Sequence, residues 1–174
     1  MEKDNDLKNI DLSKRGTAKY FSTKKIGMIL VTRLYPTVLS YYQRKLGTEK
    51  TVQVLRDLGS YLTDDFFKIY KKKRKNLQDY IKDWFKIFYD SKVDIKKIND
   101  KLYHVIDRDC ILCMDIVLEG LPFHYCTPYG GSIERLLNVL AEQGKIPKFK
   151  YKVETIASKG HGNPYCTHTI SLEE

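Results

Sequence analysis

The length, composition and charge of this chain exclude several classes of protein. Its 174 residues match one ordinary domain, and its four cysteines follow no charged and apolar leader, so a secreted disulfide scaffold is not expected. The longest apolar run, Ile26 to Val31, is far shorter than the roughly 20 residues that span a bilayer. We therefore predict a cytoplasmic protein with reduced thiols and no membrane-spanning segment.

The net charge of +9 is distributed unevenly. Residues 1–100 carry 23 lysines and arginines against 13 acidic residues, whereas residues 101–174 carry 8 against 9. A basic surface can attract nucleic acid or an anionic membrane, yet these lysines lie among good helix formers and no nucleic-acid-binding motif accompanies them. The pattern favours a solvated helical surface, and nucleic acid is not expected as a partner.

The beginning of the chain predicts an arm followed by one domain. Residues 1–22 mix charged and polar side chains without an apolar period, so we expect the folded domain to comprise residues 23–174. From Lys24 onward, apolar residues recur at helical spacing. Pro36 predicts a kink or break in this first helix, and Gly47 is placed to end it.

Two further helices are expected before the sheet. Thr48 can cap a second helix whose apolar stripe extends to Ile69 and which ends in the basic run Lys71–Lys75. That run resembles a polyanion-binding signal, but cations at a helix C-terminus are also favoured by the macrodipole, which is the interpretation we prefer. Asn76 can cap a third helix. Its aromatic and aliphatic stripe consists of Leu77, Tyr80, Ile81, Trp84, Phe85 and Phe88.

After Asp90 the apolar period changes from helical to alternating. Residues 93–106 predict a β-hairpin with its turn at Asn99 and Asp100, and His104 alternates with apolar residues, as expected for a core-facing or pocket-lining histidine. Residues 109–118 fit either a strand or a helix.

The last part of the chain predicts one helix and two strands. The helix is expected to start at Ser132 and to end at Gly144, and the strands to lie around residues 149–156 and 165–172. Helices first and antiparallel strands afterwards indicate an α+β fold, with N-terminal helices packed on a C-terminal antiparallel β-sheet.

All cysteines and histidines fall between residues 104 and 168. Thiolate and imidazole bind soft and borderline metals and perform redox or nucleophilic chemistry, so this distribution indicates one site in the C-terminal part. No glycine-rich phosphate loop and no nucleophile elbow is present. The residues concerned are His104, Cys110, Cys113, His124, Cys126, His161, Cys166 and His168.

The order of features in the C-terminal part resembles the 4-vinyl reductase domain family. Cys126 is followed by Gly130 and Gly131, then by Glu154 on a strand, and finally by Cys166 before an alternating strand. The resemblance covers most of residues 30–172. It implies a fold similar to that of TRAPP vesicle-tethering subunits and of the sensor domains of aromatic-responsive transcription activators, together with homodimer formation.

The resemblance also implies a metal site. In the sensor members, cysteines and a glutamate hold zinc, and an apolar small molecule binds in a neighbouring pocket, which carries over to Cys126, Glu154 and Cys166. Where the family has a middle cysteine, this chain has Ala157. His161 can supply the missing ligand, because imidazole replaces thiolate in four-coordinate zinc sites.

Other ligands and other chemistry remain open. His124 and His168 each lie two residues from a motif cysteine, so both can reach the same ion. Cys110 and Cys113 form a C-x-x-C pair that can donate to the metal, help to hold an iron-sulfur cluster or act as a redox dithiol, although apolar packing of these cysteines is favoured.

The leading functional hypothesis is a sensor or carrier domain that binds an apolar small molecule and holds a structural zinc. Its sensory output would pass through a protein partner or through the dimer. One alternative is a reductase or hydrolase that uses Cys110 and Cys113 or an open metal site. A second alternative is an interaction scaffold without metal.

Overall fold

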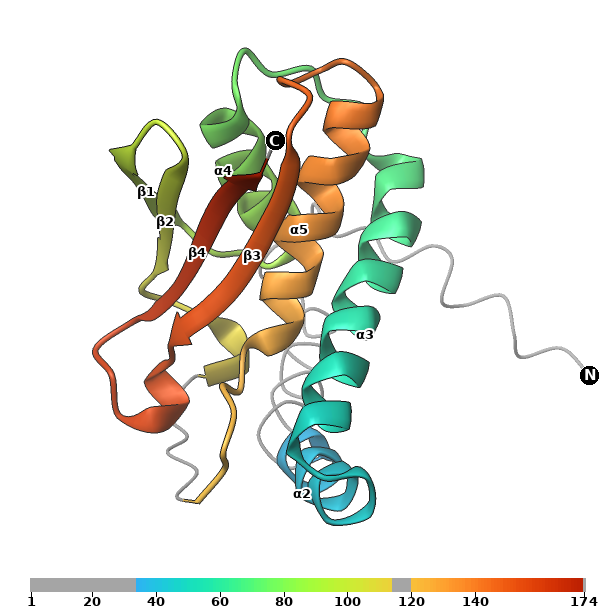
Figure 1. Cartoon of the computed structure of the whole chain (residues 1–174), viewed down its shortest axis with the longest axis vertical. Helices are drawn as coiled ribbons and strands as arrows, with labels where there is room; N and C mark the ends of the chain where they lie inside the picture. Colours follow the sequence, from blue (N-terminus) through green and yellow to red (C-terminus); the bar gives the residue numbers. More distant parts are fainter. Residues whose placement is uncertain (1–33, 114–119, 174) are drawn as a thin grey trace, which may run out of the picture.

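The computed structural model describes residues 34–113 and 120–173. The described part has an α+β fold, as predicted: three helices and a hairpin are followed by a fourth helix and a second pair of strands (Figure 1). The predicted arm, residues 1–22, lies outside the described residues. In chain order the elements are α2 (Tyr35–Leu46), α3 (Thr48–Ile69), α4 (Leu77–Phe88), β1 (Val93–Asn99), β2 (Leu102–Asp107), η2 (Ile111–Cys113), α5 (Thr127–Glu142), β3 (Lys150–Ala157), η3 (Lys159–His161) and β4 (Cys166–Glu173).

The four strands form one antiparallel sheet in the order β1-β2-β4-β3. Helix α5 packs between β3 and α3, so α3 forms an outer layer on that side (Figure 1). The predicted hairpin and its turn after Asn99 are confirmed. No helix in the described part of the chain is both long and apolar enough to cross a membrane.

The junction between α2 and α3 differs in detail from the prediction. Pro36 lies in the first turn of α2, where its missing N–H is harmless. The part of the predicted helix before Leu34 lies outside the described residues. Gly47 ends α2 with a positive φ of 77°. Thr48 was expected as a cap but is already inside α3, and its hydroxyl accepts a hydrogen bond from the Gln43 side chain at 2.9 Å.

Helix α4 follows its predicted cap and stripe closely. The Asn76 side chain accepts a hydrogen bond from the backbone N–H of Asp79 at 2.9 Å, which satisfies one of the free donors at the helix start. The buried face carries Tyr80, Ile81, Trp84 and Phe85. These side chains belong to the hydrophobic core, so the aromatic stripe is a packing surface.

Helix α5 starts five residues earlier than predicted. It begins at Thr127 with Pro128 in its first turn, and Ser132 is buried in the second turn. The Ser132 hydroxyl lies 2.7 Å from that of Thr63 and 2.6 Å from that of Tyr89. Serine favours helix caps over helix interiors. These tertiary hydrogen bonds stabilise Ser132 at a buried position inside the helix.

Two glycines let α3 and α5 approach closely. A Cβ atom on Gly59 of α3 would overlap the carbonyl oxygen of Pro128, and one on Gly131 of α5 would overlap that of Arg56. Gly131 precedes the predicted helix start at Ser132, and the structure places it within α5 itself. The close crossing fixes the start of α5 relative to α3.

Candidate metal centre

Four cysteines converge at one end of the molecule. The sulfur atoms of Cys110, Cys113, Cys126 and Cys166 all lie within 4.8 Å of one another, and all four residues are buried. They come from chain segments that are far apart in sequence. No other group of three or more potential metal ligands was found in the described residues.

Secondary structure positions each cysteine. Strand β2 ends at Asp107, which pairs with Cys166 at the start of β4. The turn after β2 and the first residue of β4 therefore meet at the same end of these two central strands. The backbone N–H of Cys113 donates to the carbonyl of Cys110 at 3.0 Å, which folds the C-x-x-C pair into a tight turn. Cys126 directly precedes α5.

Cys166 is the cysteine best prepared to be a thiolate. The backbone N–H of Lys159 donates to its sulfur at 3.4 Å. Hydrogen bonds from the thiols of Cys110, Cys113 and Cys126, together with this N–H, hold the pKa of Cys166 well below its usual range. Hydrogen bonding to Cys113 is the main cause that raises the pKa of Cys110, and hydrogen bonding to Cys110 is the main cause that raises the pKa of Cys126.

The donor set fits a single divalent ion. Four thiolates bound tetrahedrally at about 2.3 Å have sulfur atoms about 3.8 Å apart, which is compatible with the spacing of these cysteines. A multi-iron cluster requires its cysteines to bind different irons and hence to stand further apart. Zinc or one iron ion matches an all-sulfur tetrahedron.

Two of the four ligands expected from the sequence belong to this cluster. Cys126 and Cys166 are brought together, but Glu154 lies on the outward face of β3 beside Lys152, at 3.7 Å, with 66% of its side chain exposed. Alternation along β3 turns Tyr151 and Val153 into the core, which places Glu154 outside. His161 lies in η3.

The histidines around the cysteines bind one another and their neighbours. The Nδ1 atoms of His124 and His161 lie 3.1 Å apart, and Nε2 of His161 is buried without a protein partner. Burial, and then the nearby His161, lowers the pKa of His124. His168 is fully buried, its Nδ1 lies 3.0 Å from the Thr155 hydroxyl, and burial lowers its pKa to about 4. His104, in β2, is half-buried.

Cys110 and Cys113 are the members of this cluster that sequence reasoning placed only among the alternatives. The signal was present, because a C-x-x-C pair is a common zinc-binding spacing. Their predicted burial is confirmed. The structure brings this pair together with Cys126 and Cys166, the arrangement that was left open as one alternative.

Comparison with known proteins identifies solved structures that have a similar fold. No family model and no curated protein matches this sequence. Among solved structures, subunit 3 of the trafficking protein particle complex from Naegleria fowleri, covalently bound to palmitic acid, aligns with a TM-score of 0.65 at 15% identity, covering 86% of this chain and 97% of that one.

Two further structures align over most of the chain. The phenol-responsive sensory domain of the transcription activator PoxR, solved with phenol, gives a TM-score of 0.56 at 14% identity, covering 82% of this chain and 74% of that one. A vinyl-4-reductase family protein from Methanocaldococcus jannaschii gives 0.49 at 12% identity, covering 84% and 88%. The predicted resemblance is confirmed at the level of the fold, which is TRAPP-like.

Proposed function

We propose that this chain is a small-molecule-binding domain, a sensor or carrier, whose four cysteines hold one structural zinc ion. The observation that carries the metal site is the convergence of four buried sulfur atoms within 4.8 Å. The ligand set replaces Glu154 and His161 with Cys110 and Cys113.

The donor set supports a structural role for the ion. Four protein ligands complete a tetrahedron and leave no position for water or substrate, whereas catalytic zinc sites keep one position open. When bound, the ion would supply the positive charge that lets all four thiols ionise, and it would join the turn after β2, the start of α5 and the start of β4.

The small-molecule part of the proposal is supported by the fold. The PoxR domain, which shares this fold, was crystallised with phenol, and the Naegleria fowleri subunit carries palmitic acid. We therefore expect an apolar ligand, with homodimers as the functional state. A thermal-shift screen of phenols and fatty acids against the zinc-loaded protein tests this part, and unchanged melting across both series would contradict it.

Elemental analysis of purified, untagged protein tests the metal site. We expect about one zinc per chain, which is lost in each of the variants Cys110→Ser, Cys113→Ser, Cys126→Ser and Cys166→Ser. The matched controls Glu154→Gln and His161→Gln are expected to retain it.

Each alternative has its own outcome in this experiment. Loss of zinc in both control variants with retention in Cys110→Ser would favour the ligands that the family resemblance implies. Iron with acid-labile sulfide and visible absorption would indicate a cluster. Protein prepared without oxygen that contains no metal would contradict the centre and favour a dithiol or a metal-free scaffold.

A further inference from the structure

The end of the molecule opposite the cysteines is strongly basic. Two connections meet there: residues 70–76 join α3 to α4, and residues 143–149 join α5 to β3 (Figure 1). The ammonium group of Lys145 lies 5.3 Å from the centre of the Phe67 ring, which ties the second connection to the end of α3. The six lysines of these connections define what we call the basic end: Lys71, Lys72, Lys73, Lys75, Lys145 and Lys148.

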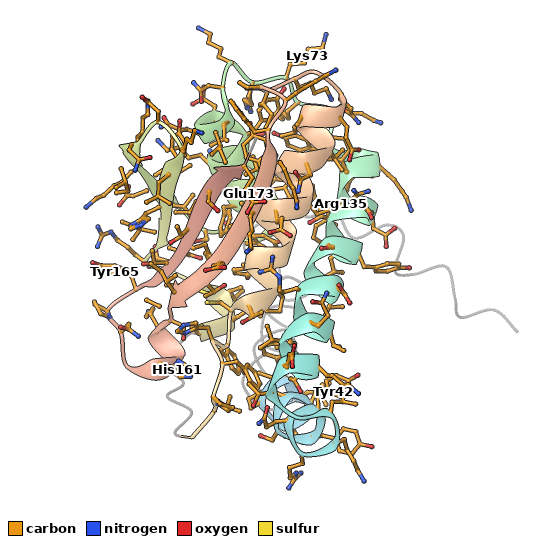
Figure 2. The ribbon with its side chains drawn as sticks, viewed as in Figure 1. Tyr42, Lys73, Arg135, His161, Tyr165 and Glu173 are labelled. Atoms are coloured by element: carbon orange, nitrogen blue, oxygen red, sulfur yellow. The ribbon has the colours of Figure 1, made fainter. Side chains whose placement is uncertain are left out.

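These lysines are exposed and form no ion pairs with the described residues. Eight ion pairs are found among the described residues, and none of them includes one of these six lysines. Figure 2 shows Lys73 extending away from the fold. Acidic residues also lie at this end: Asp83 pairs with Arg74 and interacts electrostatically with Lys72, and Asp79 lies in the first turn of α4.

The one arginine of the run has a different role. Arg74 forms an ion pair with Asp83 of α4, and the Tyr70 hydroxyl donates to the same carboxylate at 2.9 Å. This arrangement anchors the first connection to α4, and the carboxylate of Asp83 neutralises the charge of Arg74. The neighbouring lysines are exposed to solvent, and the contacts of Tyr70 and Arg74 hold the backbone that carries them.

The helix macrodipole does not account for the run. Helix α3 ends at Ile69, so Lys71, Lys72, Lys73 and Lys75 all follow the helix and lie outside its last turn. Favourable interaction with the dipole falls off within that turn. The expectation that the run forms the C-terminal turn of the helix is therefore wrong, and its charge needs another explanation.

We propose that the basic end binds the surface of an anionic lipid bilayer. Lysines attract anionic headgroups as point charges, and several at one end of a rigid domain act together. Exposed apolar side chains accompany them: Ile69 is 70% exposed at the end of α3, and Phe149 is 36% exposed beside Lys148. Nucleic-acid recognition favours free arginines and stacking platforms, and Arg74 is already occupied.

Vesicle binding tests this proposal with the full-length, metal-loaded protein. Vesicles of phosphatidylcholine, alone or mixed with phosphatidylglycerol, are sedimented with the protein at low and high salt. We expect binding only to the mixed vesicles and loss of binding at high salt. The double variant Lys73→Glu/Lys75→Glu should bind about 10-fold or more weakly, and Ile69→Ser should weaken binding while leaving its salt dependence unchanged.

A matched variant separates this surface from net charge. Lys45→Glu/Lys50→Glu changes the same number of exposed charges near the junction of α2 and α3, away from the basic end, and should bind like the wild type. Equal binding by both double variants would overturn the proposal, as would equal affinity for neutral vesicles. Binding to RNA without binding to vesicles would assign the surface to nucleic acid instead. The zinc content of each variant reports on the proposed metal centre independently.

Discussion

Gly59 of α3 lies directly against the carbonyl group of Pro128 in the first turn of α5, so close that no side chain fits between them. A Cβ atom there would also lie 2.9 Å from the backbone nitrogen of Ser132. These neighbours are backbone atoms, which cannot move aside without separating the two helices.

Gly59→Ala is therefore expected to destabilise the protein by at least about 3 kcal/mol, at the upper end of overpacking effects. Urea denaturation followed by circular dichroism measures the change. Gly144→Ala is the control, because this residue has open space around it and a φ of 68°, so only backbone strain of about 1 kcal/mol applies. Similar losses in both variants would contradict tight crossing at Gly59.

Ser132 links α5 to α3 and α4 through its hydroxyl group. Besides Thr63 and Tyr89, the indole N–H of Trp84 donates to it at 3.3 Å. Ser132→Ala leaves buried polar groups unpaired, so we expect a loss of about 2–4 kcal/mol in the free energy of unfolding.

Ser171→Ala serves as the comparison for Ser132→Ala. The Ser171 hydroxyl forms a single exposed contact, to the Lys152 carbonyl at 3.3 Å, and the change should stay within about 0.5 kcal/mol. If the two alanine variants lost the same stability, the hydrogen bonds of Ser132 would not be contributing.

Asp83 should make stability depend on pH in acid. Burial opposes its ionisation, but hydrogen bonds from Arg74 and Tyr70 prevail and hold its pKa below the usual value. A carboxylate with a lowered pKa in the folded state stabilises the fold above its unfolded pKa of about 3.9, and this stability is lost as the pH falls through the folded value.

Asp83→Asn should accordingly cost about 1–2 kcal/mol at pH 7, and the difference from the wild type should shrink steadily below about pH 4. Denaturant titrations between neutral pH and the acid limit measure both quantities. Asp65→Asn, which removes only an exposed pair with Lys68, should change little at any pH. If the stability difference between Asp83→Asn and the wild type grew as the pH fell, the pKa of Asp83 would not be lowered in the folded state.

Removing the proposed zinc ion should loosen the fold as a whole. A structural zinc ion adds its binding free energy to folding, so a chelator should lower the melting temperature by at least about 10 °C. Calorimetry before and after chelation measures this shift, and added zinc should reverse it. In Cys113→Ser the chelator should have no further effect. An unchanged melting temperature in chelated wild-type protein would show that the cysteines contribute only by packing.

Local signals in the sequence were sufficient for most of the fold. The period of α4 and the cap at Asn76 depend on neighbouring residues only, and both are confirmed. The start of α5 could not be placed by the same rules, because Ser132 is a good cap by type and its actual environment comes from Thr63 and Tyr89, on other helices. Pro128, a first-turn residue, was the overlooked local signal.

In the candidate site, too, local sequence signals predict some features, and others depend on tertiary contacts. Alternation of apolar and polar residues along β3 is enough to predict that Glu154 faces outward. The meeting of Cys110 and Cys113 with Cys166 depends on the register that pairs Asp107 with Cys166, and register between strands far apart in sequence is a property of the folded sheet.

The position of Cys166 has a consequence for synthesis. Cys110, Cys113 and Cys126 leave the ribosome well before β4, which carries the fourth sulfur, so the proposed zinc site can close only after almost all of the described chain has emerged. Until then, three thiols lack their partner and remain open to oxidation or to exchange of a loosely held ion. Closing the site is thus a late event in maturation, and the availability of zinc at that moment would decide how much of the new chain reaches its final form.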